Sequence, residues 1–335
     1  MRSIAFALTL LATPAAASEL TTHITDQHIL PAFQALAQSS SALAQTAQKE
    51  CDAQSPDLRA AFGEAFDSWI AASHYRFGPT ETDNRAFALA FWPDSRGKTP
   101  KALAKLIHEE DAAVSDPDSF ASYTIAARGF YALEYLLYDP ELSTAGQPAY
   151  RCTLTRAISY DIAATAAAIL ADWQQTYAAE MRSPGNRYQS DEEIAQELFK
   201  ALNTGLQVTD DLRLGRPLGT FDRPRPLRAE ARRSGRSLRH LLVSLNALEP
   251  LALALAEADS AADPSLKAEL AQSFAKIRDR AEAVEDPTFA SVADPAGRIR
   301  IEALRQDVQD LRALVAARLG PVLGVAAGFN ALDGD

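Results

Sequence analysis

The sequence predicts an all-α fold made of two packed antiparallel helical bundles. Apolar residues recur at helical spacing through most of the chain, and alanine and leucine are abundant while runs of β-branched residues are scarce. No segment of alternating polar and apolar residues is flanked by hairpin turns, so no strand is predicted. The predicted helices cover residues 24–49, 56–74, 99–113, 118–138, 153–181, 191–213, 227–257, 265–284 and 296–318.

Two stretches rich in proline and glycine interrupt these helices. Ser183-Pro184-Gly185-Asn186 predicts a boundary between an N-terminal bundle, residues 18–182, and a C-terminal bundle, residues 183–335. A longer loop runs from Gly215 to Pro226 inside the second bundle. The acidic turn that begins at Asp191 marks the first helix of that bundle, because carboxylates stabilise the positive end of the helix dipole.

Residues 1–17 have the pattern of a secretory signal peptide. Arg2 supplies a positive charge, a short apolar run extends from Ile4 to Leu11, and Ala15-Ala16-Ala17 forms a cleavage region of small residues. The apolar run is far shorter than the roughly 20 residues that a membrane-spanning helix needs. We therefore expect cleavage after Ala17, export to the periplasm and no spanning segment; the alternative is an N-terminal helix of the mature chain.

The charge and cysteine content narrow the class of protein further. The formal net charge of −11 argues against a nucleic-acid partner, which requires a basic surface. The two cysteines, Cys51 and Cys152, are expected to form a disulfide in an oxidising compartment, and two unpaired thiols are the alternative. The chain contains no P-loop, no Gly-x-Gly-x-x-Gly, no Cys-x-x-Cys and no Gly-x-Ser-x-Gly motif.

The segment from Arg128 to Tyr138 is the best candidate for a functional site. Glu134 is its only acid among residues that favour burial, and a buried carboxylate needs a partner. Tyr131 lies three residues earlier, on the same face of the predicted helix. Gly129 weakens the helix, which is explained if another backbone or a ligand comes close. The pattern fits a metal or ligand site, or else an internal Glu–Arg or Glu–Tyr hydrogen bond.

This segment resembles the Gly-x-His-x-x-Glu helix motif of the imelysin family, and the resemblance extends along most of the mature chain. That family contains exported helical proteins linked to iron-regulated expression and to periplasmic iron uptake, and it takes its name from an insulin-cleaving peptidase. The further blocks that resemble the family are Trp69 with His74-Tyr75-Arg76-Phe77-Gly78-Pro79, Phe91-Trp92-Pro93-Asp94, residues 152–173, residues 212–219, and residues 230–245 with Ser234-Gly235-Arg236-Ser237.

The chain departs from the family motif at one position, where Tyr131 replaces the histidine. No His-Glu-x-x-His is present, and a zinc peptidase normally needs three protein ligands that include histidine. If the bundles bring the two blocks together, His74, Tyr131 and Glu134 form a candidate metal site suited to iron. The resemblance implies that further residues line this site, namely Trp69, Arg76, Asp94, Gly129, Glu230, Ser234, Arg236 and Ser237. Loss of metal binding in this branch is the alternative.

A second feature is a group of arginines in an acidic chain. It consists of Arg213, Arg216, Arg223, Arg225, Arg228, Arg232, Arg233, Arg236 and Arg239. Arginine binds carboxylates and phosphates through two parallel hydrogen bonds, so this group is a candidate surface for an anion or an envelope protein partner. The alternatives are a solvated face that balances acidic neighbours and contact with anionic lipid at a membrane surface.

The sequence thus predicts an imelysin-like periplasmic protein that binds a metal ion or small ligand, with iron as the implied cargo. Two other classes remain open at this point. One is a metallopeptidase, and the other is a metal-free protein that docks an envelope partner through its arginine-rich helix.

Overall fold

The computed structural model of the chain describes residues 14–258 and 263–324. Within these ranges all regular elements are helices, and the only β-type pairing is one isolated bridge between Thr220 and Arg223. The predicted all-α class is therefore confirmed. Residues 1–13 of the predicted signal peptide lie outside the described part, while residues 14–17 begin the first helix, so export and cleavage stay predictions.

The first group of helices is built around one long hairpin. Helix α1 (Pro14–Ile24) passes through a π-helical turn into α2 (Leu30–Lys49), which packs between α3 (Pro56–Ala72) and α8 (Pro148–Asp172). Helix α7 (Gly129–Tyr138) lies on α8 and carries the candidate motif. The shorter helices of this group are α4 (Arg85–Leu89), α5 (Lys98–Glu109), α6 (Pro117–Ala121) and α9 (Ala178–Arg182).

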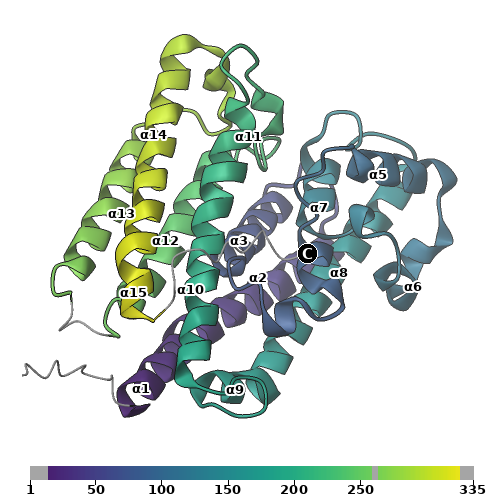
Figure 1. Cartoon of the computed structure of the whole chain (residues 1–335). Helices are drawn as coiled ribbons and strands as arrows, with labels where there is room; N and C mark the ends of the chain where they lie inside the picture. Colours follow the sequence, from purple (N-terminus) through teal and green to yellow (C-terminus); the bar gives the residue numbers. More distant parts are fainter. Residues whose placement is uncertain (1–13, 259–262, 325–335) are drawn as a thin grey trace, which may run out of the picture.

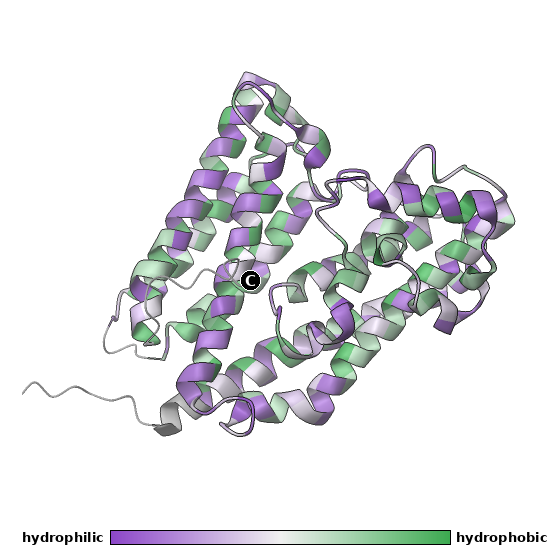
Figure 2. Ribbon diagram, turned by 45° about the vertical axis from the view of Figure 1, so that its right-hand side comes forward, coloured by the Kyte–Doolittle hydropathy of each residue, from purple (hydrophilic) through white to green (hydrophobic). Residues whose placement is uncertain are grey.

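The second group is an upright bundle beside the first (Figure 1). Helix α10 (Asp191–Gln207) continues through a π-helical stretch, Val208–Leu214, into α11 (Gly215–Leu218). Helices α12 (Ser237–Leu255), α13 (Leu266–Glu282) and α14 (Pro295–Leu314) complete the bundle, followed by a π-helical turn and the short α15 (Gly320–Val322). Hydrophobic residues mark the sides of the helices that face their neighbours (Figure 2).

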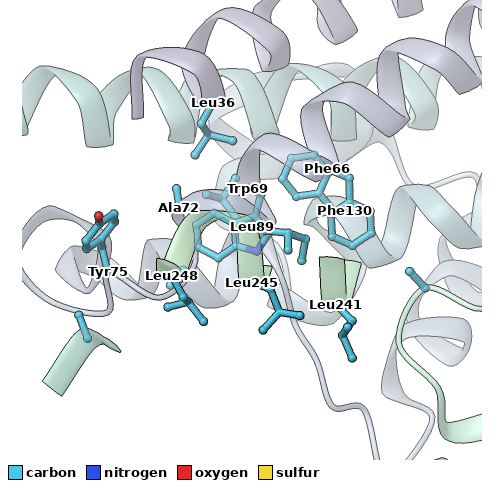
Figure 3. Close-up of a cluster of buried hydrophobic side chains, with 14 of the residues drawn as sticks. Leu36, Phe66, Trp69, Ala72, Tyr75, Leu89, Phe130, Leu241, Leu245 and Leu248 are labelled. Carbon is cyan, nitrogen blue, oxygen red and sulfur yellow. The ribbon is translucent and has the colours of Figure 1, made fainter. Parts of the chain in front are cut away.

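The two groups share a core rather than touching only at their surfaces. Helix α3 packs on α12, and α1 packs on α10. Figure 3 shows Phe66 and Trp69 of α3 opposite Leu241, Leu245 and Leu248 of α12. All five side chains are at most 3% exposed. Two packed bundles were predicted, and this packing agrees; the boundary after residue 182 stays a prediction.

Several helices begin where the sequence provides a capping side chain. Ser55 accepts a hydrogen bond from the backbone N–H of Leu58 at the start of α3, and Pro56 occupies the first helical position. Ser190 caps α10 by accepting from the N–H of Glu193, whose carboxylate accepts the N–H of Gln189 in return. These exchanges satisfy amides that the helix itself leaves without partners.

Two predicted helices are interrupted or begin late in the structure. The single helix expected over 118–138 is broken between α6 and α7, and Gly129 starts α7 with φ at +74°. The helix expected from 227 begins only at Ser237, because residues 229–236 form a turn in which Ala231 and Gly235 also have positive φ.

The disulfide is confirmed. Cys51 and Cys152 are bonded across a sequence separation of 101 residues and join the α2–α3 connection to α8. Among the described residues, two helical stretches, Pro148–Arg182 and Ser237–Leu255, are long and apolar enough to cross a membrane, with 44% and 50% of their most apolar windows buried in the protein. Core helices meet the same criterion, so the expectation of no spanning segment stays a prediction.

Candidate functional site

Tyr131 connects the two helical groups. It projects from α7, and its hydroxyl donates to Glu230 Oε1 at 2.6 Å. The second oxygen of Glu230 accepts a hydrogen bond of 2.7 Å from Arg213 Nε, which comes from the π-helical continuation of α10. Arg213 also donates to the Ser244 hydroxyl of α12 at 3.1 Å, and His240 Nδ1 lies 3.4 Å from the same Glu230 oxygen.

This network is buried, and its charges shift the pKa values of Glu230 and Tyr131. Glu230 and Arg213 are each 3% exposed. Burial alone would raise the pKa of Glu230, but the Arg213 charge, His240 and the Tyr131 hydroxyl hold it at about 2, below its usual 4.5. Burial and the charge of Glu230 raise the pKa of Tyr131 well above 10. Tyr131 is therefore a neutral hydrogen-bond donor at pH 7.

Glu134 is held from the other side. Its carboxylate is 2% exposed, and Oε1 accepts two hydrogen bonds from Ser234, at 3.0 Å from the backbone N–H and 2.8 Å from the hydroxyl. Ser234 lies in the turn that precedes α12. The predicted Glu–Tyr or Glu–Arg bond at Glu134 is therefore not the observed contact: Ser234 binds Glu134, and Tyr131 binds a different glutamate.

A cavity of about 260 Å³ opens over Tyr131 and Glu134, between α7 and the turn that carries Ser234. Its aromatic walls are Phe91, Trp92, Tyr131 and Tyr135. Its charged walls are Asp94, Glu134, Arg216, Arg228 and Arg233. The cavity thus joins a polar rim to a floor made of the candidate motif.

The charged walls differ in how far the chain itself satisfies them. Asp94 accepts the backbone N–H groups of Arg96, Lys98 and Thr99 at the start of α5, and although partial burial opposes this, these bonds lower the pKa of its carboxyl. Arg233 lies 3.7 Å over the Tyr135 ring and donates to Asp139 at 3.0 Å.

Arg216 has no such partner. Its guanidinium lies 5.7 Å from the centre of the Trp92 ring, and its Nε is buried without a hydrogen bond among the described residues. Burial and the nearby charge of Arg228 lower the pKa of Arg216.

Gly129 is required by the way α7 begins. A Cβ at this position would lie 2.2 Å from the carbonyl oxygen of Ala88 and 2.3 Å from that of Leu89. The backbone at the end of α4 therefore touches Gly129 directly. The close approach expected from the sequence is one of backbone on backbone.

Two predicted members of the site lie elsewhere. His74 is 4% exposed beside Tyr75, with ring centres 3.9 Å apart, and neither of its ring nitrogens makes a hydrogen bond among the described residues. Arg76 pairs with Glu81 at 2.6 Å and lines a different cavity, beside α8 and α10. The structure therefore records no contact that joins His74 or Arg76 to Glu134.

The remaining predicted residues support the site from behind. Trp69 is part of the shared core between α3 and α12 (Figure 3). Ser237 donates to the backbone carbonyl of Glu230 at 2.5 Å, and Arg236 donates to the carbonyl of Gly63 at 2.9 Å and pairs with Asp67. These contacts anchor the turn that carries Glu230 and Ser234 onto α3.

Only some of the arginines in the arginine-rich group are without an ion pair among the described residues. Arg213, Arg233, Arg236 and Arg239 form ion pairs with acids of this chain. The other five, which make no ion pair within residues 14–258 and 263–324, are Arg216, Arg223, Arg225, Arg228 and Arg232. Internal neutralisation thus accounts for nearly half of the group.

Sequence reasoning missed the Glu230–Arg213 pair and its neighbours His240 and Ser244. One signal was available. The apolar positions of α10 continue at helical spacing through Gly205 and Thr209 to Arg213, so that a charge falls on the buried face of the helix. A buried charge predicts an oppositely charged partner.

The side chains at the cavity do not supply a complete set of ligands for a bare metal ion. Tyr131 keeps its proton for Glu230, and Asp94 is engaged by backbone amides. The parts of the chain that the structure describes contain no group of three or more His, Cys, Asp or Glu side chains placed to hold a metal. Arginine charges at the wall also disfavour a free cation, whereas they favour a ligand that carries negative charge.

The family model for Imelysin matches residues 29–315. This chain belongs to the imelysin family. The resemblance read from the sequence motifs is thereby confirmed for a member that has tyrosine in place of the motif histidine.

Two solved structures have the same fold as this chain. An imelysin-like protein from Psychrobacter arcticum has a TM-score of 0.79 at 19% identity, and the match covers 96% of this chain and 100% of that chain. A candidate iron-regulated protein A precursor from Parabacteroides distasonis has a TM-score of 0.78 at 14% identity, covering 95% and 96%. Identities this low establish a common fold alone. No curated protein matches the chain.

Proposed function

We propose that this member of the imelysin family is an exported binding protein of the cell envelope that serves iron uptake or homeostasis. One observation carries the proposal: Glu134 is fixed by Ser234 from the opposite side of a cavity that both helical groups line. A ligand in that cavity would contact both groups at once. Family membership and the iron-regulated neighbour support the link to iron. The N-terminal sequence pattern supports export.

The binding interpretation is favoured over catalysis by the residues themselves. Tyr131 is a protonated donor to Glu230, so it is not poised to activate a water. A peptidase of the zinc type would need histidine ligands that this motif lacks. If the chain were such an enzyme, peptide hydrolysis would be sensitive to chelators and abolished in Glu134→Gln.

Iron transport is tested in cells. A deletion strain complemented with the parent chain should take up radioactive iron under iron limitation, and complementation with Glu134→Gln should restore much less uptake. Glu141→Gln is the matched control, because Glu141 is an exposed acid outside the cavity. Equal uptake by the deletion strain and the complemented strain would refute a role in iron acquisition.

Iron retention and export are tested on the purified chain. Protein prepared from the periplasm without chelators or a histidine tag should retain iron by elemental mass spectrometry, and Glu134→Gln should retain less. The mass of the same preparation should correspond to a chain that begins at Ser18. Recovery of the full-length chain from the cytoplasm would contradict the export half of the proposal.

A further inference from the structure

The cavity over Glu134 has an uneven distribution of charge that identifies its ligand class. Both of its carboxylates are hydrogen-bonded by this chain, Asp94 by backbone amides and Glu134 by Ser234. Among its arginines, Arg233 is paired with Asp139. Arg216 and Arg228 line the cavity and form no ion pair with any described residue. The wall therefore presents two guanidinium groups that the protein does not neutralise.

Arg216 is the better positioned of the two. Its guanidinium is set against the Trp92 ring, and its Nε is buried without a hydrogen-bond acceptor. A buried donor without a partner is costly to the folded protein, so its presence at the edge of a cavity points to an acceptor supplied by a ligand. The planar guanidinium fork matches the geometry of a carboxylate or a phosphate.

Glu134 adds a requirement that a simple anion does not meet. Both hydrogen bonds from Ser234 reach Oε1. The carboxylate lines the cavity, so its second oxygen is an acceptor available to a ligand. A ligand that brings only negative charge would be repelled by Glu134. A ligand that brings a hydroxyl group beside its anionic groups would donate to Glu134 and accept from Arg216.

We infer that the cavity binds a small hydroxycarboxylate, with its carboxylates on Arg216 and Arg228 and a hydroxyl group on Glu134. The volume of about 260 Å³ suits a compact acid rather than a peptide. This inference rests on the proposed function and deepens it, because carboxylate and hydroxyl oxygens are hard donors that bind iron well. The iron would then be carried as a complex of the acid, and the free acid and its ferric complex share the chemistry that the cavity recognises.

The experiment is isothermal titration calorimetry on the mature full chain. The probes are citrate and tricarballylate, which has the same three carboxylates but no hydroxyl group, each with and without ferric iron. We expect citrate to bind at least tenfold more tightly than tricarballylate. Arg228 is exposed, so Arg228→Gln should not disturb folding, and it should weaken citrate binding by tenfold or more. The single variant Arg216→Gln should weaken citrate binding more than Arg228→Gln does.

Two controls make the result specific. Arg223→Gln removes an exposed arginine of the same loop that does not line the cavity, and it should leave citrate affinity unchanged. Glu134→Gln should narrow the preference for citrate over tricarballylate to less than threefold, because the charge that repels a ligand without a donor is gone. Equal binding of the two acids by the parent chain, equally tight binding of inorganic phosphate, or no effect of either cavity arginine would overturn the inference.

The iron arms separate this inference from the proposed function. Suppose that the chain binds iron-free citrate more tightly than tricarballylate, and that deleting its gene leaves iron uptake unchanged. That pair of results would support the ligand class and refute the role in iron acquisition. Loss of iron uptake on deletion, with no binding of citrate in either form, would support the role in iron acquisition and refute the ligand class.

Discussion

Tyr131 and Glu230 are 99 residues apart in the chain, and their side-chain oxygens are 2.6 Å apart in the fold. One residue belongs to the helix that carries the family motif, and the other to the turn before α12. The hydrogen bond therefore ties the N-terminal group of helices to the C-terminal group at the floor of the cavity. Losing this hydrogen bond should therefore lower the stability of the fold more than it weakens ligand binding.

Replacing Tyr131 by phenylalanine should lower the free energy of unfolding by about 2 kcal/mol, because a hydrogen bond to a buried charge is lost while Arg213 still neutralises Glu230. Urea titration followed by circular dichroism measures the change. Tyr135→Phe is the control, since the Tyr135 hydroxyl makes no hydrogen bond within the described chain, and it should cost less than about 0.5 kcal/mol. Equal losses in the two variants would mean that the Tyr131–Glu230 bond contributes nothing.

Glu230→Gln should destabilise the protein more, by about 3–5 kcal/mol at pH 7, because Arg213 is left buried without its counter-charge. The matched control is Glu81→Gln, which breaks the half-exposed pair with Arg76 and should cost about 1 kcal/mol or less.

The Glu230 effect should depend on pH with a defined sign. The pKa of Glu230 is about 2 in the folded chain, against a usual value of 4.5. The stabilisation is therefore complete above pH 4.5 and disappears as the pH falls from 4.5 towards 2. Acid unfolding of parent and variant should converge in that window, and a constant difference down to pH 2 would contradict the assignment.

His74 should make the protein sensitive to mild acid. Burial, aided by the charge of Arg213, lowers the pKa of His74 to about 3, so the folded state binds no proton there at pH 5 while the unfolded chain does. Stability from this residue is complete above pH 6.5 and decreases as the pH falls towards 3. Between pH 7 and pH 5 the expected loss is about 2 kcal/mol.

The measurement for His74 is the free energy of unfolding of the parent chain and of His74→Leu at pH 7 and at pH 5. The variant should lose less stability on acidification than the parent. His108→Leu, at an exposed position on α5, controls for the removal of a histidine as such. The same pH dependence in the parent and in His74→Leu would show that His74 is not the source.

Gly129→Ala should prevent normal folding, because the new methyl group would meet the carbonyl oxygens of Ala88 and Leu89 at 2.2 and 2.3 Å. Gly235→Ala provides a strict comparison: Gly235 also has positive φ, at +69°, but no atom within 4 Å of the added Cβ. Gly235→Ala should lower the free energy of unfolding only by the backbone strain, about 1–2 kcal/mol. Soluble expression and thermal melting of both variants measure the difference, and similar melting temperatures would argue against the backbone contact.

The sequence predicted most helices because their apolar spacing and capping residues are local signals. Ser190 and Glu193 at the start of α10 are an example, since the cap involves neighbours in the chain. The break before α7 was not predictable in the same way. Gly129 has positive φ there and lies against the end of α4, a contact between segments about 40 residues apart.

The candidate site was predicted only in part for the same reason. Glu134 and Tyr131 were identified as a buried acid and a neighbouring phenol, and both line the cavity. Their partners, Ser234 and Glu230, come from a distant turn that no spacing rule connects to them. The expected approach of His74 assumed that its block faces α7, whereas His74 is buried beside Tyr75 and near Arg213.

The bond between Tyr131 and Glu230 also has an evolutionary consequence. A phenol can only donate to the carboxylate of Glu230, whereas a histidine at the same position could donate, accept or carry a charge of its own. Position 131 therefore cannot change without altering what is tolerated at 230, and through it at 213. Across the imelysin family these three positions should covary, and the residue at 230 should sort histidine-bearing members from tyrosine-bearing ones into separate lineages.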